Sequence, residues 1–173
     1  MNEIQNHKQV TLSDKAIARL SQLKEALNAA NVNYTLFAHD LPIRSAQEGA
    51  EQGFGELANM APTFILRSET GYLAAIIRGD TRLSYKKIRQ KLKLKNVCLA
   101  TPEQVGQVTG SEVGYVSLFN AGVMTIMDSR LTELDTIYGG CGVPCYTLKI
   151  NPQDLIALAQ AQVFDFAEPK DKA

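Results

Sequence analysis

The sequence predicts a single α+β domain with a mixed β-sheet flanked by helices. Its 173 residues are enough for one domain with a sizeable core. Hydrophobic residues make up 45% and charged residues 21%, which is typical of a globular protein. Predicted hairpins and helices follow one another without regular alternation, which favours a mixed sheet over a parallel one. We expect the domain to span residues 11–167, with flexible tails at 1–10 and 168–173.

The first third is expected to fold as helix, strand and helix. Ser13 is a good N-cap for a helix that runs to about Asn31. Apolar residues at helical spacing form its expected core face: Ile17, Leu20, Leu23, Ala26 and Leu27. Residues 34–39 (YTLFAH) are typical of a strand that ends before Pro42, and residues 45–52 are typical of a short helix.

The middle third predicts a hairpin, two helices and an intervening strand. The hairpin pairs residues 63–67 with residues 72–78. A basic helix over 84–92 and a strand over 96–99 follow. Residues 101–104 (TPEQ) combine an N-cap, a proline at the first helical position and a capping-box glutamine, which makes the clearest helix start in the chain.

The last third is expected to consist of short elements around glycine-rich turns. They are strands over 115–118 and 123–127, a helix over 130–135, extended segments over 136–138 and 145–150, a helix from 151 to about 159 and a strand over 163–166. Asp128 or Ser129 is expected to cap the helix that begins near Arg130 rather than to act in catalysis.

Basic residues cluster in one segment of a chain whose net charge is zero. Residues 78–95 hold eight of the 18 basic residues and one of the 18 acidic residues, Asp80. A local patch of this kind suits contact with a polyanion. A solvated helix face is the alternative interpretation, and the sequence pattern favours phosphate contact only slightly.

Cysteine usage and hydropathy predict a cytoplasmic protein without membrane contact. No stretch approaches the roughly 20 apolar residues that span a bilayer, and the polar N-terminus lacks the apolar run of a signal peptide. Cys98, Cys141 and Cys145 are an odd, sparse set, which indicates reduced thiols. The spacing of Cys141 and Cys145 leaves a zinc or redox pair as a weaker alternative, so we predict no metal and no cofactor.

An ordered set of segments resembles the YbaK family of aminoacyl-tRNA deacylases and prolyl-tRNA synthetase-associated editing domains. The segments are LSYKKIRQKLKLKNVCLATPEQV, VTGSEVGYVS, MTIMDSRL, TIYGGCG and KINPQDLIAL, and they cover about residues 63–158. The resemblance implies a barrel-like mixed sheet with a small pocket that needs no metal or organic cofactor. It also implies that the pocket receives the 3′ end of a mischarged tRNA and hydrolyses its aminoacyl ester.

The chain departs from the family pattern at two positions. The family carries a Lys-Thr pair at the start of a strand, where this chain has Pro62 and Thr63. It also carries a G-x-x-x-P loop, where this chain begins with Gly114 and ends with Leu118. An acid or histidine of the family falls near Thr147. Proline has no charge and no N–H donor, so Pro62 puts hydrolysis in doubt.

Two glycine-rich loops are the expected walls of the pocket. We predict that backbone N–H groups of residues 114–117 face the developing oxyanion, since glycine allows close backbone approach. The predicted catalytic residues are Gly114, Ser117 and Thr63. Simple turns between strands are the alternative for these glycines. For the loop of residues 139–142, a flexible hairpin is an equally good interpretation.

The remaining predicted contacts are with the aminoacyl group and with tRNA. We expect substrate contacts from Phe37, His39, Tyr115, Val116, Gly139, Gly140 and Thr147. His39 suits a general base near neutral pH, although a lone histidine at a strand end is more often structural. The resemblance makes tRNA the polyanion, with contacts expected from Arg82, Lys86, Lys87, Arg89 and Lys93.

The sequence therefore predicts an editing hydrolase that deacylates mischarged tRNA in trans. Its expected partners are the tRNA acceptor end and, as a second partner, an aminoacyl-tRNA synthetase, with no role for DNA. The alternative is a module that keeps the fold without hydrolysis and binds tRNA, an aminoacyl group or a protein partner. Neither the amino acid edited nor the oligomeric state follows from the sequence.

Overall fold

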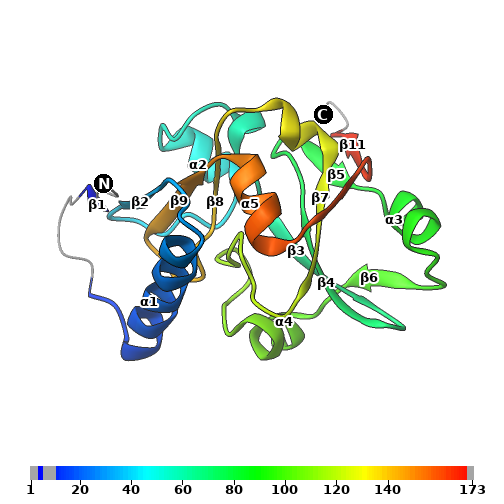
Figure 1. The fold of residues 1–173 in the computed structure, drawn as a ribbon, viewed down its shortest axis with the longest axis horizontal. Coiled ribbons are helices and arrows are strands. Elements are labelled where there is room, and N and C mark those ends of the chain that lie inside the picture. Colours follow the sequence, from blue (N-terminus) through cyan, green and yellow to red (C-terminus); the bar gives the residue numbers. More distant parts are fainter. Residues whose placement is uncertain (1–3, 6–10, 171–173) are drawn as a thin grey trace.

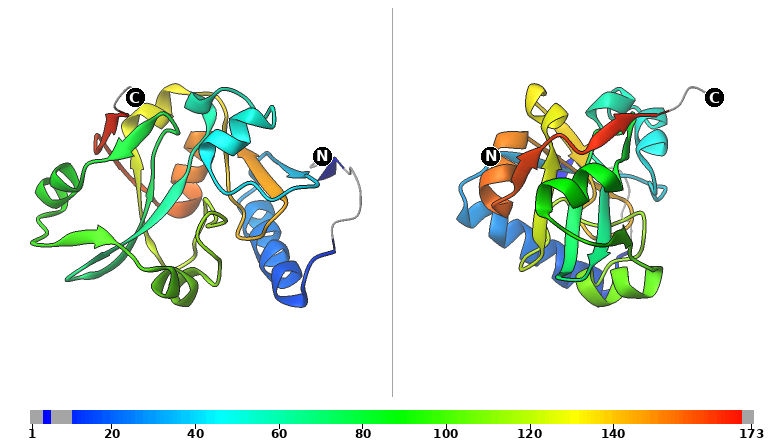
Figure 2. Two further views of the ribbon diagram at one scale, coloured as in Figure 1. Left: turned by 180° about the vertical axis from the view of Figure 1, so that it is seen from behind. Right: turned by 90° about the vertical axis from the view of Figure 1, so that its right-hand side faces the viewer.

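The strands form three sheets, none of which closes on itself within the residues that this computed structural model describes, 4–5 and 11–170 (Figure 1). The predicted α+β class with a mixed sheet is confirmed, and the sheets are open rather than joined in one barrel. Helices α1 and α3 lie at opposite ends of the molecule (Figures 1 and 2).

A four-stranded sheet has the order β1-β2-β9-β8. Its strands are β1 (Ile4–Gln5), β2 (Tyr34–Ala38), β8 (Ile137–Gly139) and β9 (Tyr146–Ile150). Strands β2 and β9 are antiparallel, and their register places Phe37 opposite Thr147. The helices α1 (Asp14–Ala29) and α5 (Pro152–Ala159) bury leucines against this sheet, so it belongs to the largest core cluster.

A five-stranded sheet has the order β10-β7-β4-β3-β6. Its strands are β3 (Thr63–Ser68), β4 (Gly71–Ile76), β6 (Val97–Leu99), β7 (Met124–Asp128) and β10 (Gln162–Phe164). Successive residues alternate between faces, so Leu66 packs in the cluster of helix α3 (Tyr85–Leu92), whereas Ile65 packs in that of α4 (Pro102–Thr109). The β3–β4 hairpin is antiparallel and β7 is parallel to β4, as a mixed sheet requires.

A small third sheet of two strands includes the C-terminal segment. Strand β11 (Ala167–Pro169) pairs antiparallel with β5 (Thr81–Leu83), and the segment runs beside α3 in the right-hand view of Figure 2. Asp128, fully buried, anchors this segment, because its Oδ2 accepts the N–H groups of Phe166 and Ala167 at 2.9 and 2.8 Å. Residues 168 and 169, which we expected to be in a tail, therefore lie in a strand.

Most predicted elements are present, and their caps explain where they begin. Ser13 accepts the N–H of Ala16, and Thr101 forms the predicted capping box with Gln104. Asp128 caps the turn after β7 by accepting the N–H of Arg130. The short helix after β2 is α2 (Ala46–Glu51), and a 3₁₀ turn, Leu57–Asn59, leads into β3.

Three local predictions are wrong. Ile17 is 50% exposed, because the buried stripe of α1 begins at Ala16 and continues through Leu20, Leu23 and Leu27. Residues 115–118 are irregular instead of a strand, and the predicted helix over 130–135 is a 3₁₀ helix, Ser129–Glu133. Strands β1, β5 and β11 were not predicted, since each is only two or three residues long. Of the expected tails, residues 1–3, 6–10 and 171–173 lie outside the described residues.

Candidate active site

The two predicted glycine loops converge on a cavity of about 580 Å³. Strand β3, the loop after α4, the β8–β9 loop and the segment before α2 line it together. Seven of the ten predicted catalytic and substrate-contact residues are among its walls: Thr63, Gly114, Tyr115, Val116, Gly139, Gly140 and Thr147. A cavity of this volume suits a small organic ligand.

The charged residues that line the cavity, among those described, are all basic. None of the described residues that line it is Asp or Glu, whereas Arg44, Arg82 and Lys170 all contribute to it. Apolar side chains such as Ile65, Val105 and Val116 form much of the rest of its wall. The arrangement is suited to a ligand with an apolar part and an anionic part.

The loop of residues 139–142 packs against the loop of residues 114–118 without space for extra atoms; we call the two loops together the glycine junction. A Cβ on Gly139 would lie 2.6 Å from Cγ of Leu118, and one on Gly140 would collide with the carbonyl oxygen of Val116. Leu118 donates its N–H to the carbonyl of Gly140 at 2.9 Å, and Gly142 donates to the carbonyl of Tyr115 at 2.9 Å. Glycine at 139 and 140 is therefore a packing requirement.

The other side of the junction rests on the segment before α2. Gly114 has φ +95°, which disfavours any other residue, and a Cβ there would lie 3.0 Å from the carbonyl oxygen of Arg44. Arg44 in turn donates from Nε to the hydroxyl of Tyr115 at 2.8 Å. The guanidinium carbon lies 5.9 Å from the ring centroid of Tyr115, so the two side chains are stacked as well as hydrogen-bonded.

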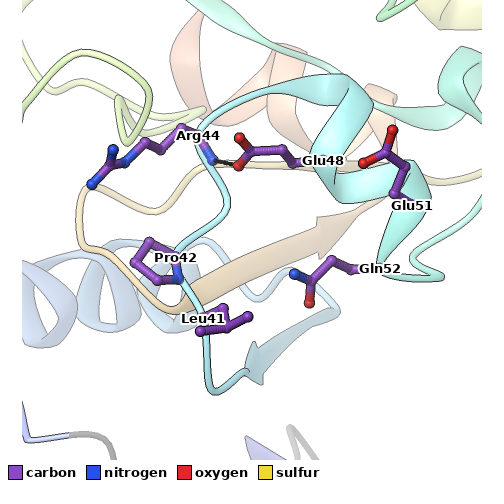
Figure 3. A pocket seen from close by; sticks show the side chains of 6 residues that line it. All are labelled: Leu41, Pro42, Arg44, Glu48, Glu51 and Gln52. Atoms are coloured by element: carbon purple, nitrogen blue, oxygen red, sulfur yellow. Dashed lines mark hydrogen bonds between the residues drawn. The ribbon is translucent and has the colours of Figure 1, made fainter.

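Arg44 lies between this cavity and a more open hollow of about 680 Å³ (Figure 3). Its N–H donates to Oε2 of Glu48 at 2.8 Å, while its side chain extends away from α2 (Figure 3). The open hollow is lined by Leu41, Pro42, Arg44, Glu48, Glu51 and Gln52. Because two of these residues are acidic, the hollow is less suited to an anion than the cavity.

The backbone N–H groups of residues 115–118 differ in their partners. The N–H of Tyr115 donates to the carbonyl of Glu112 at 3.1 Å, and that of Leu118 is bonded to Gly140. The structure pairs no described acceptor with the N–H groups of Val116 and Ser117. The Ser117 side chain is buried behind the wall, where its Oγ accepts the N–H of Phe119 at 3.1 Å, and it does not line the cavity.

Thr63 presents the one buried side-chain oxygen or nitrogen without a hydrogen-bond partner among the described residues, its Oγ1. Thr63 lines the cavity, although this oxygen itself is not exposed there. Pro62 lies beside it in the wall and accepts the N–H of Ile77 at 3.2 Å. The position of the family lysine is thus in the cavity wall, but here it carries no charge.

His39 and Phe37 lie behind the wall rather than in it. Nε2 of His39 is 3.1 Å from Oγ1 of Thr147, and Thr147 itself lines the cavity. The ring of Phe54 packs at 5.5 Å from Phe37 and 5.6 Å from His39, and it also contacts Tyr138, which does line the cavity. Burial lowers the pKa of His39 below its usual value, so the imidazole is neutral at neutral pH.

The predicted tRNA-binding residues divide into paired and exposed groups. Lys87 donates from Nζ to Asp165 at 3.1 Å, and Arg82 lies 3.4 Å from Glu168. Lys86 and Lys93 are exposed on α3, and Arg89 is half-buried. Arg82 alone of the five predicted residues lines the cavity.

The thiols show no sign of a reactive pair. Cys141 donates to the carbonyl of Tyr146 at 3.4 Å, and burial raises its pKa to about 12. Burial also raises the pKa of Cys145, which suits a protonated, unreactive thiol. In the part of the chain described, no group of three or more His, Cys, Asp or Glu residues is placed to hold a metal ion. Nor is any described helix long and apolar enough to cross a membrane.

Sequence reasoning missed two cations of the cavity. Arg44 has no signal in the sequence, because it lies in a short connection between Pro42 and the cap of α2. Lys170 was expected in a tail, yet strand β11 carries it to the cavity, and its N–H donates to the carbonyl of Asp80 at 3.3 Å.

The open α+β fold and the cavity between its sheets define a small domain with a partly open cavity, whose charged lining residues, among those described, are all basic. The chain belongs to the aminoacyl-tRNA editing domain family: the profile of that family matches residues 40–158, which is more than half of the chain. The resemblance to the YbaK family is thereby confirmed, and the cavity lies in the family's part of the chain apart from Lys170.

By sequence, the chain is similar to a part of two proline–tRNA ligases. The chain is 31% identical over 86 residues to the proline–tRNA ligase of Thermotoga neapolitana and 26% identical over 87 residues to that of Caldicellulosiruptor saccharolyticus. The matches cover 49% and 50% of this chain but 15% of each ligase, so the chain corresponds to a small part of them.

Two crystal structures share the whole fold. The hypothetical protein APE2540 superposes with a TM-score of 0.80 at 25% identity, covering 85% of this chain and 99% of the other. A proposed trans-editing enzyme for prolyl tRNA synthetase superposes with a TM-score of 0.76 at 24% identity, covering 91% and 99%. The matched fold accounts for almost the whole of both of these chains.

Proposed function

We propose that this protein is an aminoacyl-tRNA editing hydrolase that acts in trans on a mischarged tRNA. The observation that carries the proposal is the convergence of Thr63 and the glycine junction on one cavity, in a chain of the editing-domain family. Its volume of about 580 Å³ suits a terminal adenosine with a small aminoacyl group. The likeness to the proposed trans-editing enzyme supports an action on tRNA that is charged elsewhere.

The chemistry assigned to this site is the hydrolysis of an ester by water. Water attacks the carbonyl carbon, the bond from that carbon to the ribose oxygen breaks, and a proton passes to the ribose oxygen. The unpaired N–H group of Val116, which lines the cavity, is the proposed donor to the oxyanion. Loss of one such donor typically costs about 3 kcal/mol of barrier reduction. Thr63 lies in the same wall, and rotation of its side chain would expose the unpartnered Oγ1 to the water or a ribose hydroxyl.

The cations of the cavity are suited to the phosphates of the acceptor end. Arg44, Arg82 and Lys170 come from three separate elements and meet at the same cavity. The exposed Lys86 and Lys93 on α3 extend the positive surface from there. Phosphate neutralisation of this kind makes tRNA affinity fall steeply with salt.

A binding module without hydrolysis is the second candidate, and Pro62 favours it. Where the family resemblance leads us to expect a lysine, this wall offers neither a charge nor an N–H donor. The neutral wall still permits binding of the same acceptor end. The two candidates therefore differ in turnover and not in ligand.

A deacylation assay over a panel of mischarged tRNAs, including tRNA for proline charged with alanine, tests the proposal. We expect turnover of at least one substrate, and a reduction of tenfold or more in Gly114→Ala. Gly122→Ala is the matched control, because Gly122 also has a positive φ, +76°, but no atom within 4 Å of its added Cβ and no place in the cavity. Binding without turnover on any tRNA would support the second candidate, and an equal effect of both substitutions would count against the assigned loop.

A further inference from the structure

The hydrogen bonds of His39 determine which of its nitrogens carries the proton. Nδ1 lies 2.6 Å from the carbonyl oxygen of Leu41, which can only accept, so Nδ1 must carry the hydrogen. The backbone carbonyl of Tyr146 also lies beside the ring, but a neutral imidazole has one N–H hydrogen, and the Leu41 carbonyl at 2.6 Å takes it, so Nε2 is an acceptor. Oγ1 of Thr147, 3.1 Å away, must donate its hydrogen to it.

This bond fixes the polarity of a hydroxyl in the cavity wall. Thr147 lines the cavity, whereas His39 lies behind it, 8% exposed and against the ring of Phe54. Because the hydroxyl hydrogen of Thr147 is directed to His39, only its oxygen lone pairs remain for a ligand. Thr147 therefore presents an acceptor to a cavity that has no described carboxylate in its wall.

The position of this acceptor is next to the glycine junction. In the β8–β9 ladder Gly139 pairs with Leu148, so Thr147 lies beside Gly140, which in turn packs on Val116. Thr81, whose hydroxyl hydrogen is also used, lies on β5 away from these loops. An acyl carbonyl bound at the N–H group of Val116 would therefore lie on the same side of the cavity as Thr147.

We infer that His39 is a positioning residue that holds the Thr147 hydroxyl as an acceptor for the α-amine of the aminoacyl group. The inference rests on the proposed function, and it gives the site a means to prefer an acyl group with an amine over one without. A ribose hydroxyl is the other donor of the same ligand, and the test separates the two.

The test compares two probes, 3′-(L-alanylamino)-3′-deoxyadenosine and 3′-(propionylamino)-3′-deoxyadenosine, which differ only in the amine. Their amide link resists hydrolysis, so calorimetry measures binding alone. We expect the wild type to bind the alanyl probe about tenfold more tightly than the propionyl probe. Thr147→Val should remove this preference, and Thr147→Ser should keep it.

The His39 variants test the positioning role. His39→Leu should weaken binding of the alanyl probe and leave binding of the propionyl probe unchanged. In a Thr147→Val background it should have little further effect on either affinity. His39→Gln, which can still place an acceptor near Thr147, should restore part of the preference. Thermal melting of each variant separates loss of fold from loss of preference, and the Thr147→Ser and Thr147→Val pair tests the idea even where His39 variants unfold.

Three outcomes are decisive. If Thr147→Val lost the same affinity for both probes, the inference would be overturned in favour of a ribose contact, and the proposed function would stand. A wild type that binds both probes equally would overturn the inference too. Binding of neither probe by the wild type would overturn the proposed function itself, and the inference with it.

Discussion

The glycine junction and the basic helix α3 contribute to the proposed function in opposite ways. At the junction, bare backbone packs against Val116 and Leu118 with no room for a methyl group. On α3, the basic side chains lie on the surface, and Lys87 is paired with Asp165. The contribution of the junction depends on its close packing, and the contribution of α3 depends on its net charge. Substitutions should therefore cause abrupt losses at the junction and graded ones on the helix.

The largest effect is expected from Gly140→Ala. The new methyl group would collide with the carbonyl oxygen of Val116, so both loops must move apart. Overpacking of this kind typically costs about 1–3 kcal/mol, and the displaced N–H groups should abolish deacylation. Urea unfolding and the deacylation assay measure the two effects.

Gly106→Ala is the control for that substitution. Gly106 lies within α4 and its added Cβ would have no atom within 4 Å, so alanine should stabilise the helix by about 0.5–1 kcal/mol. If Gly140→Ala were as stable and active as Gly106→Ala, the close packing of the junction would be irrelevant to function.

Pro62→Lys should raise the deacylation rate rather than lower it. The wall around Thr63 has an unpaired hydroxyl but no cation at position 62, and a lysine there would add charge beside the reacting ester. We expect a rise in deacylation rate of about tenfold or more, since one added oxyanion donor is worth that much. Single-turnover deacylation measures it.

Pro62→Met separates charge from the removal of proline. It releases the same backbone constraint without a cation, so its rate should stay at the wild-type level. A similar rise in rate in both variants would assign the gain to the backbone. No rise in either variant would mean that a lysine at position 62 has no role in the reaction.

The two regions also differ in how much the sequence could predict. Gly114, Gly139 and Gly140 could be placed in a site only through the family resemblance, because their packing partners are contributed by distant residues such as Arg44 and Leu118. The basic helix was evident from charge alone. Its pairing was not, since Asp165 lies on a C-terminal segment whose path depends on the buried carboxylate of Asp128.

Local sequence reasoning succeeded where local forces determine the structure. The capping box at Thr101 and the β3–β4 hairpin depend on neighbours in sequence, and both are present. Residues 115–118 are apolar like a strand, yet the turn at Gly114 and the bonds to Gly140 hold them as an irregular wall. The same tertiary contacts that prevent a strand leave the N–H group of Val116, in the cavity wall, without a partner among the described residues.

A pH dependence of stability is expected from His39, behind the junction. Burial lowers its pKa in the folded protein, so the unfolded chain, with an ordinary pKa near 6.5, binds a proton first. The free energy of unfolding should therefore fall as pH drops through 6.5 and below, and should not depend on His39 above that range. Urea unfolding between pH 7.5 and pH 5 should show a flatter profile in His39→Gln. Identical profiles would mean that His39 is not held neutral.

The smallest effects are expected on α3, where Lys86→Met and Lys87→Met form a matched pair. Lys87 contacts Asp165 at 3.1 Å on the surface, so its loss should cost less than about 1 kcal/mol, and loss of the exposed Lys86 should cost nothing measurable. If α3 contacts tRNA, removal of Lys86 should reduce the slope of log affinity against log salt by about one. Filter binding of tRNA at several salt concentrations measures the slope. An unchanged slope would make the helix a solvated face and leave the cavity cations Arg44, Arg82 and Lys170 to hold the acceptor end, so the charge that matters would lie beside the junction after all.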